Sequence, residues 1–169
     1  MMITRNFEED NNMSKTLIAY FSAQGSTAKL AKTMAAAADA DLYEIKPAVP
    51  YERRDLNWMD KKSRTTVEMQ DRNCRPALAD TDAPVAEADT IFLGFPIWWY
   101  REPSIIDSFL DAYDWAGKTV VPFCTSGGSD LGEGQDRIEA LAKGAKVLRG
   151  RRFSARMSEA ELKKWIEAI

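Results

Sequence analysis

Histidine is absent from the whole chain, and its absence excludes several common kinds of catalytic site. Ser-His-Asp and Cys-His nucleophile systems, the usual zinc sites with histidine ligands, and haem held by histidine all require this residue. None of the remaining side chains has an unperturbed pKa near neutrality. Demanding chemistry at neutral pH would therefore come most easily from a bound cofactor.

Cysteine and long apolar runs are also scarce. The two cysteines, Cys74 and Cys124, have neither the spacing of a disulfide framework nor that of a zinc site. No apolar run approaches the roughly 18 residues of a membrane span, and residues 1–12 do not resemble a secretory signal. We therefore expect a cytoplasmic protein with no membrane partner. Residues 1–13 are expected to form a disordered extension, and residues 14–169 a single domain.

Charge is modest overall, with a net value of -3, but it is unevenly spread. Residues 143–158 carry six basic residues and no acidic one, yet this segment is short and interrupted by apolar residues. It does not argue for nucleic-acid binding, and we expect none. Residues 77–115 carry eight acidic residues against one arginine, which would suit a docking face.

Hydrophobic periodicity predicts alternating strands and helices, and hence an α/β fold with an open parallel sheet covered on both faces. The expected strands are residues 15–21, 41–47, 89–95, 118–124 and 146–150. Helices are expected over residues 26–40, 58–70, after Pro103, and over 133–142 and 158–168. Pro122 is a difficulty because proline cannot donate a ladder hydrogen bond, so either the strand starts late or a bulge lies there.

Three segments follow the first, third and fourth predicted strands, where ligands bind in open α/β sheets. They read SAQGST (22–27), PIWWY (96–100) and TSGGS (125–129). One suits a phosphate, one is aromatic, and one is small and rich in glycine. Together they suit a flat ring that carries a phosphate tail.

The first segment offers hydroxyl, amide and backbone donors at a predicted helix N-terminus, where a phosphate meets free N–H groups. The donors are Ser22, Gln24, Ser26 and Thr27, and Gly25 allows close approach. It contains no lysine or arginine, so a phosphate would be held by hydrogen bonds alone. The alternative is that Ser26 or Thr27 only caps the helix. The segment matches neither the Walker loop nor the dinucleotide fingerprint.

The second and third segments each leave alternatives open. Trp98, Trp99 and Tyr100 cannot all point inward from a strand, because neighbouring side chains alternate. They could cap the core, form a homodimer contact, or stack on a flavin ring. Gly127 and Gly128 would admit a ring edge, or they could form a simple turn.

The stretches FSAQGSTAKLAK, GFPIWWYREPS and PFCTSGGSDLGEG resemble the three FMN-binding loops of the flavodoxin family, in particular a branch with P-I-W-W in its second loop. The resemblance covers residues 14–168. It implies a flavodoxin-like, doubly wound five-stranded parallel sheet in the order 2-1-3-4-5, with helices on both faces, and one non-covalent FMN.

The resemblance also implies which residues bind the cofactor, and it implies no metal and no catalytic side chain. The FMN phosphate would be held by Ser22, Gln24, Gly25, Ser26 and Thr27. The wall beside the ring would be formed by Pro96, Ile97, Trp98, Trp99 and Tyr100. The other ring edge would be lined by Thr125, Ser126, Gly127, Gly128 and Ser129. Gln24 stands where a hydroxyl is common, so weaker or altered phosphate contacts are expected.

Two redox functions remain open. The first is an electron carrier that serves a redox partner protein, although carriers of this family tend to be more acidic than a net charge of -3. The second is an FMN-dependent oxidoreductase that takes hydride from NAD(P)H and reduces a quinone or similar acceptor. Basic residues that could meet a dinucleotide phosphate, or simply be solvated, are Arg53, Arg54, Lys61, Lys62 and Arg64.

A third hypothesis is a flavin-free phosphate-binding or structural module. A phospho-receiver shares this strand order but needs acidic residues after its first strand and an aspartate ending its third. Phe21-Ser22 and Phe95-Pro96 occupy these places, which excludes that function.

Overall fold

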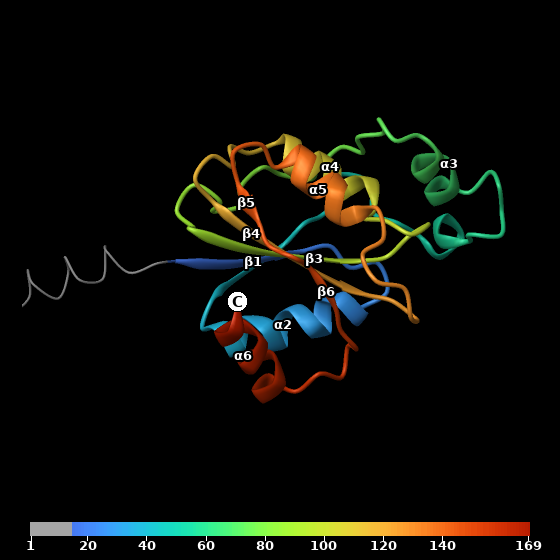
Figure 1. Cartoon of the computed structure of the whole chain (residues 1–169). Helices are drawn as coiled ribbons and strands as arrows, with labels where there is room; N and C mark the ends of the chain where they lie inside the picture. The colour runs from blue at the N-terminus through green and yellow to red at the C-terminus, as the bar shows by residue number, and fades with distance from the viewer. Residues whose placement is uncertain (1–14) are drawn as a thin grey trace, which may run out of the picture.

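A parallel β-sheet lies between two layers of helices in the computed structural model, which describes residues 15–169 (Figure 1). The extension predicted over residues 1–13 lies outside the described residues. The sheet has the order β2-β1-β3-β4-β5, and a short strand, β6, also pairs with β4. Its strands are β1 (Thr16–Tyr20), β2 (Asp41–Glu44), β3 (Thr90–Pro96), β4 (Thr119–Thr125), β5 (Lys146–Val147) and β6 (Arg151–Arg152). The predicted fold class and strand order are confirmed.

The helices cover both faces of this sheet (Figure 1). They are α2 (Ser26–Ala38), α3 (Arg64–Gln70), α4 (Ser104–Asp111), α5 (Gly134–Leu141) and α6 (Glu159–Ala168), with a short 3-10 helix, η1 (Arg53–Leu56). Neighbouring residues of β1 point to opposite faces, as the pleat requires. Leu17 and Ala19 join the cluster under α4 and α5, while Ile18 and Tyr20 join the cluster under α2 and α6. None of the helices in residues 15–169 is long and apolar enough to cross a membrane.

Pro122 lies inside β4 in regular register opposite Leu93, so both predicted explanations, a late strand start and a bulge, are wrong. The irregularity lies in the neighbouring edge instead. The backbone carbonyls of Val120 and Cys124 accept hydrogen bonds from backbone N–H groups of that edge, both at 2.9 Å. Alternate residues of a strand turn their backbone groups to the same side, so the backbone nitrogen of Pro122 also faces this edge. The edge is broken there into β5 and β6, and the missing N–H of proline therefore leaves no ladder bond unmade.

The long connection between β2 and β3 holds η1 and α3 and lies at one end of the sheet (Figure 1). The helix predicted over 58–70 is shorter, because Ser63 caps it and its hydroxyl accepts a hydrogen bond from Thr66 N at 3.4 Å. Trp58 therefore lies outside the helix, in the turn that precedes it. This places an aromatic side chain near the ends of the central strands.

Candidate functional site

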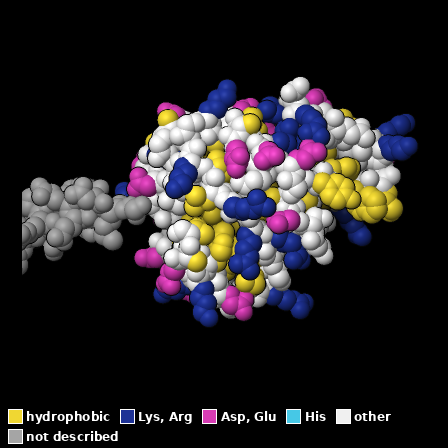
Figure 2. All heavy atoms as spheres, viewed as in Figure 1, with side chains coloured by type: hydrophobic (Ala, Val, Ile, Leu, Met, Phe, Trp, Pro, Cys, Tyr) yellow, Lys and Arg dark blue, Asp and Glu magenta, His cyan; other side chains and the backbone are white. Residues whose placement is uncertain are grey.

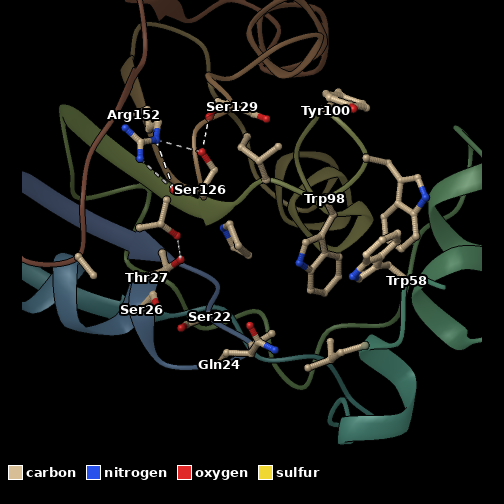
Figure 3. A pocket seen from close by; sticks show the side chains of 18 of the residues that line it. Ser22, Gln24, Ser26, Thr27, Trp58, Trp98, Tyr100, Ser126, Ser129 and Arg152 are labelled. Atoms are coloured by element: carbon tan, nitrogen blue, oxygen red, sulfur yellow. Dashed lines mark hydrogen bonds between the residues drawn. The ribbon is translucent and has the colours of Figure 1, made fainter.

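A cavity of about 1050 Å³ opens at the carboxyl ends of β1, β3 and β4, where the three predicted segments meet. Figure 3 shows their side chains converging on it from different elements. All the residues predicted to bind the cofactor line this cavity, except Gly25 and Gly128. The sheet order explains the convergence, because β3 lies between β1 and β4 and parallel strands end on the same side.

The first segment forms the N-terminus of α2, and the helix-cap alternative for Ser26 and Thr27 is wrong. Gly25 is the N-cap, with φ of 98°, and no side chain caps the helix. The buried hydroxyl of Thr27 bonds that of Thr125 instead, at 2.7 Å between oxygens. Within residues 15–169, the backbone N–H groups of Ser26, Thr27 and Ala28 find no acceptor. These free donors are what an anion requires at a helix N-terminus.

The second segment forms a tight turn that sends its three aromatic side chains in different directions. Trp98 and Arg101 exchange both backbone hydrogen bonds, with N···O distances of 3.0 and 3.2 Å. Trp99 and Tyr100 between them have positive φ angles of 48° and 64°. This conformation costs a residue with a side chain about 1–2 kcal/mol, so the turn is strained.

The turn separates one partly buried aromatic residue from two exposed ones. Trp98 packs edge-on against Phe21 and Tyr51, with ring centroids 5.5 Å away in both pairs. Trp99 and Tyr100 stay exposed, Tyr100 to 74%. One tryptophan therefore caps the core at the cavity, while the next two side chains remain available to a ligand or partner.

The third segment is held open by its own hydrogen bonds. The hydroxyl of Ser126 donates to the carbonyl of Ser129 and accepts from Gly128 N at 3.3 Å. A methyl group on Gly127 or Gly128 would meet no atom within 4 Å. The two glycines therefore leave empty space beside the cavity, and no packing of the protein itself requires them there.

The model of the flavodoxin family matches residues 15–169. The chain belongs to the flavodoxin family. This confirms the resemblance seen in the sequence and supports FMN as the cofactor. A search of curated proteins gives no match.

Solved structures agree with this assignment. A candidate flavoprotein from Bacteroides uniformis is 46% identical over 91% of this chain and 98% of its own, with a TM-score of 0.86. Another from Bacteroides eggerthii is 41% identical over 93% of this chain and 98% of its own, with a TM-score of 0.87. A Lactobacillus acidophilus flavoprotein in complex with FMN shares the fold, at 24% identity, 91% and 99% coverage and a TM-score of 0.71.

Sequence reasoning missed several residues that line the cavity of this flavodoxin-family protein. They come from the β2–β3 connection (Leu56, Trp58 and Thr65) and from the segment after β5 (Arg152, Phe153, Ser154 and Ala155). Among the lining residues that fall in the described range 15–169, Arg152 has the one charged side chain. Its Nε and Nη2 donate to the carbonyl of Ser126 at 3.3 and 3.1 Å, and Nε also donates to the Ser126 hydroxyl at 3.1 Å. A positive charge therefore lines the cavity beside the third segment, although the first segment contains no lysine or arginine.

The two charge patterns singled out in the sequence have a mixed outcome. Arg53, Arg54, Lys61 and Lys62 are exposed, whereas Arg64 is held by Glu68 and stacks on Tyr51, 3.9 Å from its ring centroid. In the acidic stretch 77–115, Glu102 and Asp107 are fully buried and cannot contact a partner, and the docking face stays a prediction for the other six carboxylates.

Proposed function

We propose that this protein binds FMN non-covalently in the cavity and transfers electrons through it. The proposal depends mainly on one observation: the three segments converge on a single cavity with free backbone donors in one segment and aromatic side chains in another. Bound FMN supplies one- and two-electron chemistry that the side chains of this chain lack.

Each segment has a role that its chemistry supports. The N-terminus of α2 would hold the phosphate, with Ser22, Gln24, Ser26 and Thr27 around it. Arg152 would add positive charge. The aromatic turn would flank the ring, and the third segment would admit its edge between Thr125 and Ser129. The residues present therefore fit FMN.

Alanine at Gly127 provides a direct test of the ring position. Because no atom lies within 4 Å of the added methyl group, the ligand-free variant should unfold at the wild-type temperature. Its FMN affinity should nevertheless fall by about tenfold, because the ring edge would meet the methyl group. Titration of flavin fluorescence measures the affinity, and calorimetry measures the unfolding temperature.

Gly128→Ala is the matched control, because this glycine has equal free space but does not line the cavity. It should bind FMN as the wild type does. Equal affinity of wild type and Gly127→Ala would show that the ring does not lie against the third segment. Absence of FMN binding by the wild-type protein would contradict the proposed function itself.

Arg152→Gln tests the charge at the cavity. FMN affinity should fall by about tenfold and riboflavin affinity by about threefold or less, because only FMN has a phosphate for the arginine to attract. Added salt should weaken FMN binding less in the variant than in the wild type. An equal loss for the two ligands would instead mean that Arg152 acts only by anchoring Ser126.

The first candidate activity is electron carriage to a redox partner protein, for which the exposed Trp99 and Tyr100 would serve as a contact. We also propose a reducing compartment, the cytoplasm. Within the described residues, Cys74 and Cys124 are free thiols, and burial raises the pKa of Cys124 to about 12, which keeps it unreactive.

A second candidate activity is NAD(P)H-dependent reduction of a quinone-type acceptor, favoured by the extent of the cavity beyond the three segments. It reaches Leu56, Trp58 and Thr65, and Trp58 is 71% exposed at its rim. Figure 2 shows exposed hydrophobic side chains beside lysines and arginines at the end of the molecule that carries η1 and α3. Flavin-dependent oxidation of NAD(P)H that speeds up with quinone would favour this activity, and no oxidation would favour the carrier.

A further inference from the structure

Two carboxyl groups, Glu102 and Asp107, are fully buried immediately behind the aromatic turn. Glu102 comes two residues after Tyr100, and Asp107 lies in the first turn of α4. Buried carboxylates are costly unless their oxygens are paired or hydrogen-bonded. Their presence within the core of a flavodoxin-family protein therefore requires a physical reason.

Arginines reach only one oxygen of each carboxyl group. Arg137 of α5 donates from Nε to Glu102 Oε2 at 3.0 Å and from Nη2 to Asp107 Oδ2 at 2.7 Å. Arg101 lies farther away, with Nη1 at 3.7 Å from Glu102 Oε2 and 3.5 Å from Asp107 Oδ2. Arg75 Nη1 lies 3.7 Å from the same oxygen of Asp107.

The other oxygens, Glu102 Oε1 and Asp107 Oδ1, are buried and find no hydrogen-bond donor in residues 15–169. Gly134, the first residue of α5, lies beside this oxygen, because a methyl group there would be in ordinary van der Waals contact with Glu102 Oε1, at 3.7 Å. Two unsatisfied anionic oxygens would cost about 1–3 kcal/mol each, or more. Arg137 holds the two carboxyl groups side by side, so a proton on one group would let it donate a hydrogen bond to the other and would remove one of the two buried charges.

We propose that Glu102 and Asp107 share one proton as a carboxylic acid–carboxylate pair, and that this pair fixes the stem of the aromatic turn. The stem is the Arg101–Glu102 segment. Arg101 Nη1 donates to the carbonyl of Glu102 at 3.1 Å, and its Nη2 donates to the carbonyl of Met69 at 3.2 Å. Loss of the proton would place two adjacent negative charges behind the strained turn.

The charges around the pair agree with this assignment. The pKa of Glu102 is raised to about 8, first by burial and then by the hydrogen bond to Asp107 and the negative charge of Asp107. Arg137 opposes this shift. The folded protein therefore holds the proton more tightly than the unfolded chain does. The stability that this bound proton gives the folded protein is complete below 4.5, the pKa of Glu102 in the unfolded chain. It is lost as the pH rises through about 8, the pKa of Glu102 in the folded protein.

The other ionisable groups near the pair come from every element packed against it. They are Arg101 in the stem, Asp111 in α4, Glu133 at the N-cap of α5 and Arg137 within it, Glu68 in α3, and Arg72, Cys74 and Arg75 in the segment after α3. The pKa of Glu133 is lowered, first by its hydrogen bond with Arg72, and burial raises the pKa of Cys74 above 9.0. Both shifts move the pKa of the group away from neutrality.

The first experiment needs no flavin, so it is independent of the proposed function. Infrared spectra of the full chain without FMN should show a carboxylic acid band at pH 6 that fades by pH 9. The unfolding temperature should fall by about 5 °C between pH 6 and 8.5. In Glu102→Gln, the band should be lost and the temperature should stay flat, because the amide donates to Asp107 at every pH.

Glu133→Gln is the control, since it removes a carboxylate at the N-cap of α5 that pairs with Arg72 and not with Glu102. It should keep the wild-type band and pH profile. Absence of the band in the wild-type protein would overturn the shared proton even if Glu102→Gln failed to fold. A wild-type pH profile in a folded Glu102→Gln variant would overturn it as well.

The second experiment tests the effect on the turn and rests on the proposed FMN binding. FMN titrations at pH 6.5 and 8.5 give, at each pH, the ratio of the affinity of Glu102→Gln to that of the wild type. This ratio should be about threefold higher at pH 8.5 than at pH 6.5. The comparison at each pH cancels the titration of the FMN phosphate. A constant ratio, together with the infrared band, would keep the shared proton but overturn its role in positioning the turn.

Discussion

Gly132→Ala should lower the affinity for FMN by about tenfold or more while the core remains folded. Gly132 has a positive φ of 57°, and an added methyl group would lie 2.2 Å from the carbonyl oxygen of Tyr100. The next residue, Glu133, donates its N–H to that same oxygen at 3.1 Å. Because the clashing atom belongs to the backbone, no change of rotamer can relieve it, and the aromatic turn must shift.

Gly117→Ala separates this clash from simple backbone strain. Gly117 also has a positive φ, of 77°, but no atom lies within 4 Å of an added methyl group. This variant should lose about 1–2 kcal/mol of stability and bind FMN normally. Fluorescence titration of both variants, beside their thermal unfolding, measures the two effects. Normal FMN affinity in Gly132→Ala would show that the position of the turn does not matter for binding.

Gly94→Ala should destabilise the fold by about 3 kcal/mol, and lower the unfolding temperature by roughly 6–12 °C. Gly94 lies in the middle of β3, in register with Phe123 of β4. An added methyl group would lie 2.3, 2.5 and 2.9 Å from three atoms of the Phe123 ring. That ring is fully buried and cannot move into solvent, so the strand and its neighbours must distort.

A smaller residue at position 123 should relieve the clash. Phe123→Leu alone leaves a gap, but in combination with Gly94→Ala it should cost less than the sum of the two single changes. Urea unfolding of the two single variants and the double variant measures this coupling. Strict additivity would mean that the ring of Phe123 is not what excludes a side chain at Gly94.

The sheet and its faces could be predicted because their signals are local and repeated. The apolar run of β1 and the small and apolar face of α2, with Leu30, Ala31 and Met34 buried, follow from periodicity alone. The cap of α2 stayed open in the sequence because serine and threonine are the usual caps. Here Gly25 adopts a positive φ, and the hydroxyl of Thr27 is used by Thr125, 98 positions away.

The rest of the site could not be predicted because it depends on distant segments. Aromatic residues strongly disfavour a positive φ, so nothing local predicts the turn at Trp99 and Tyr100. Arg152 was one of six basic residues in its segment, and only the pairing of β6 with β4 shows that it reaches Ser126. Trp58 was assigned to a helix that in fact begins after Ser63.

The break opposite Pro122 also affects how the sheet ends. An uninterrupted edge strand offers a row of unpaired backbone N–H and C=O groups. A strand of another chain can pair with these groups, which leads to aggregation. In the part of the chain that the structure describes, this edge consists of two pairs of residues, β5 and β6, and three of their four side chains are Lys146, Arg151 and Arg152. Short, positively charged pieces make a poor template, so the same proline that interrupts the ladder helps to protect the protein against edge-to-edge aggregation.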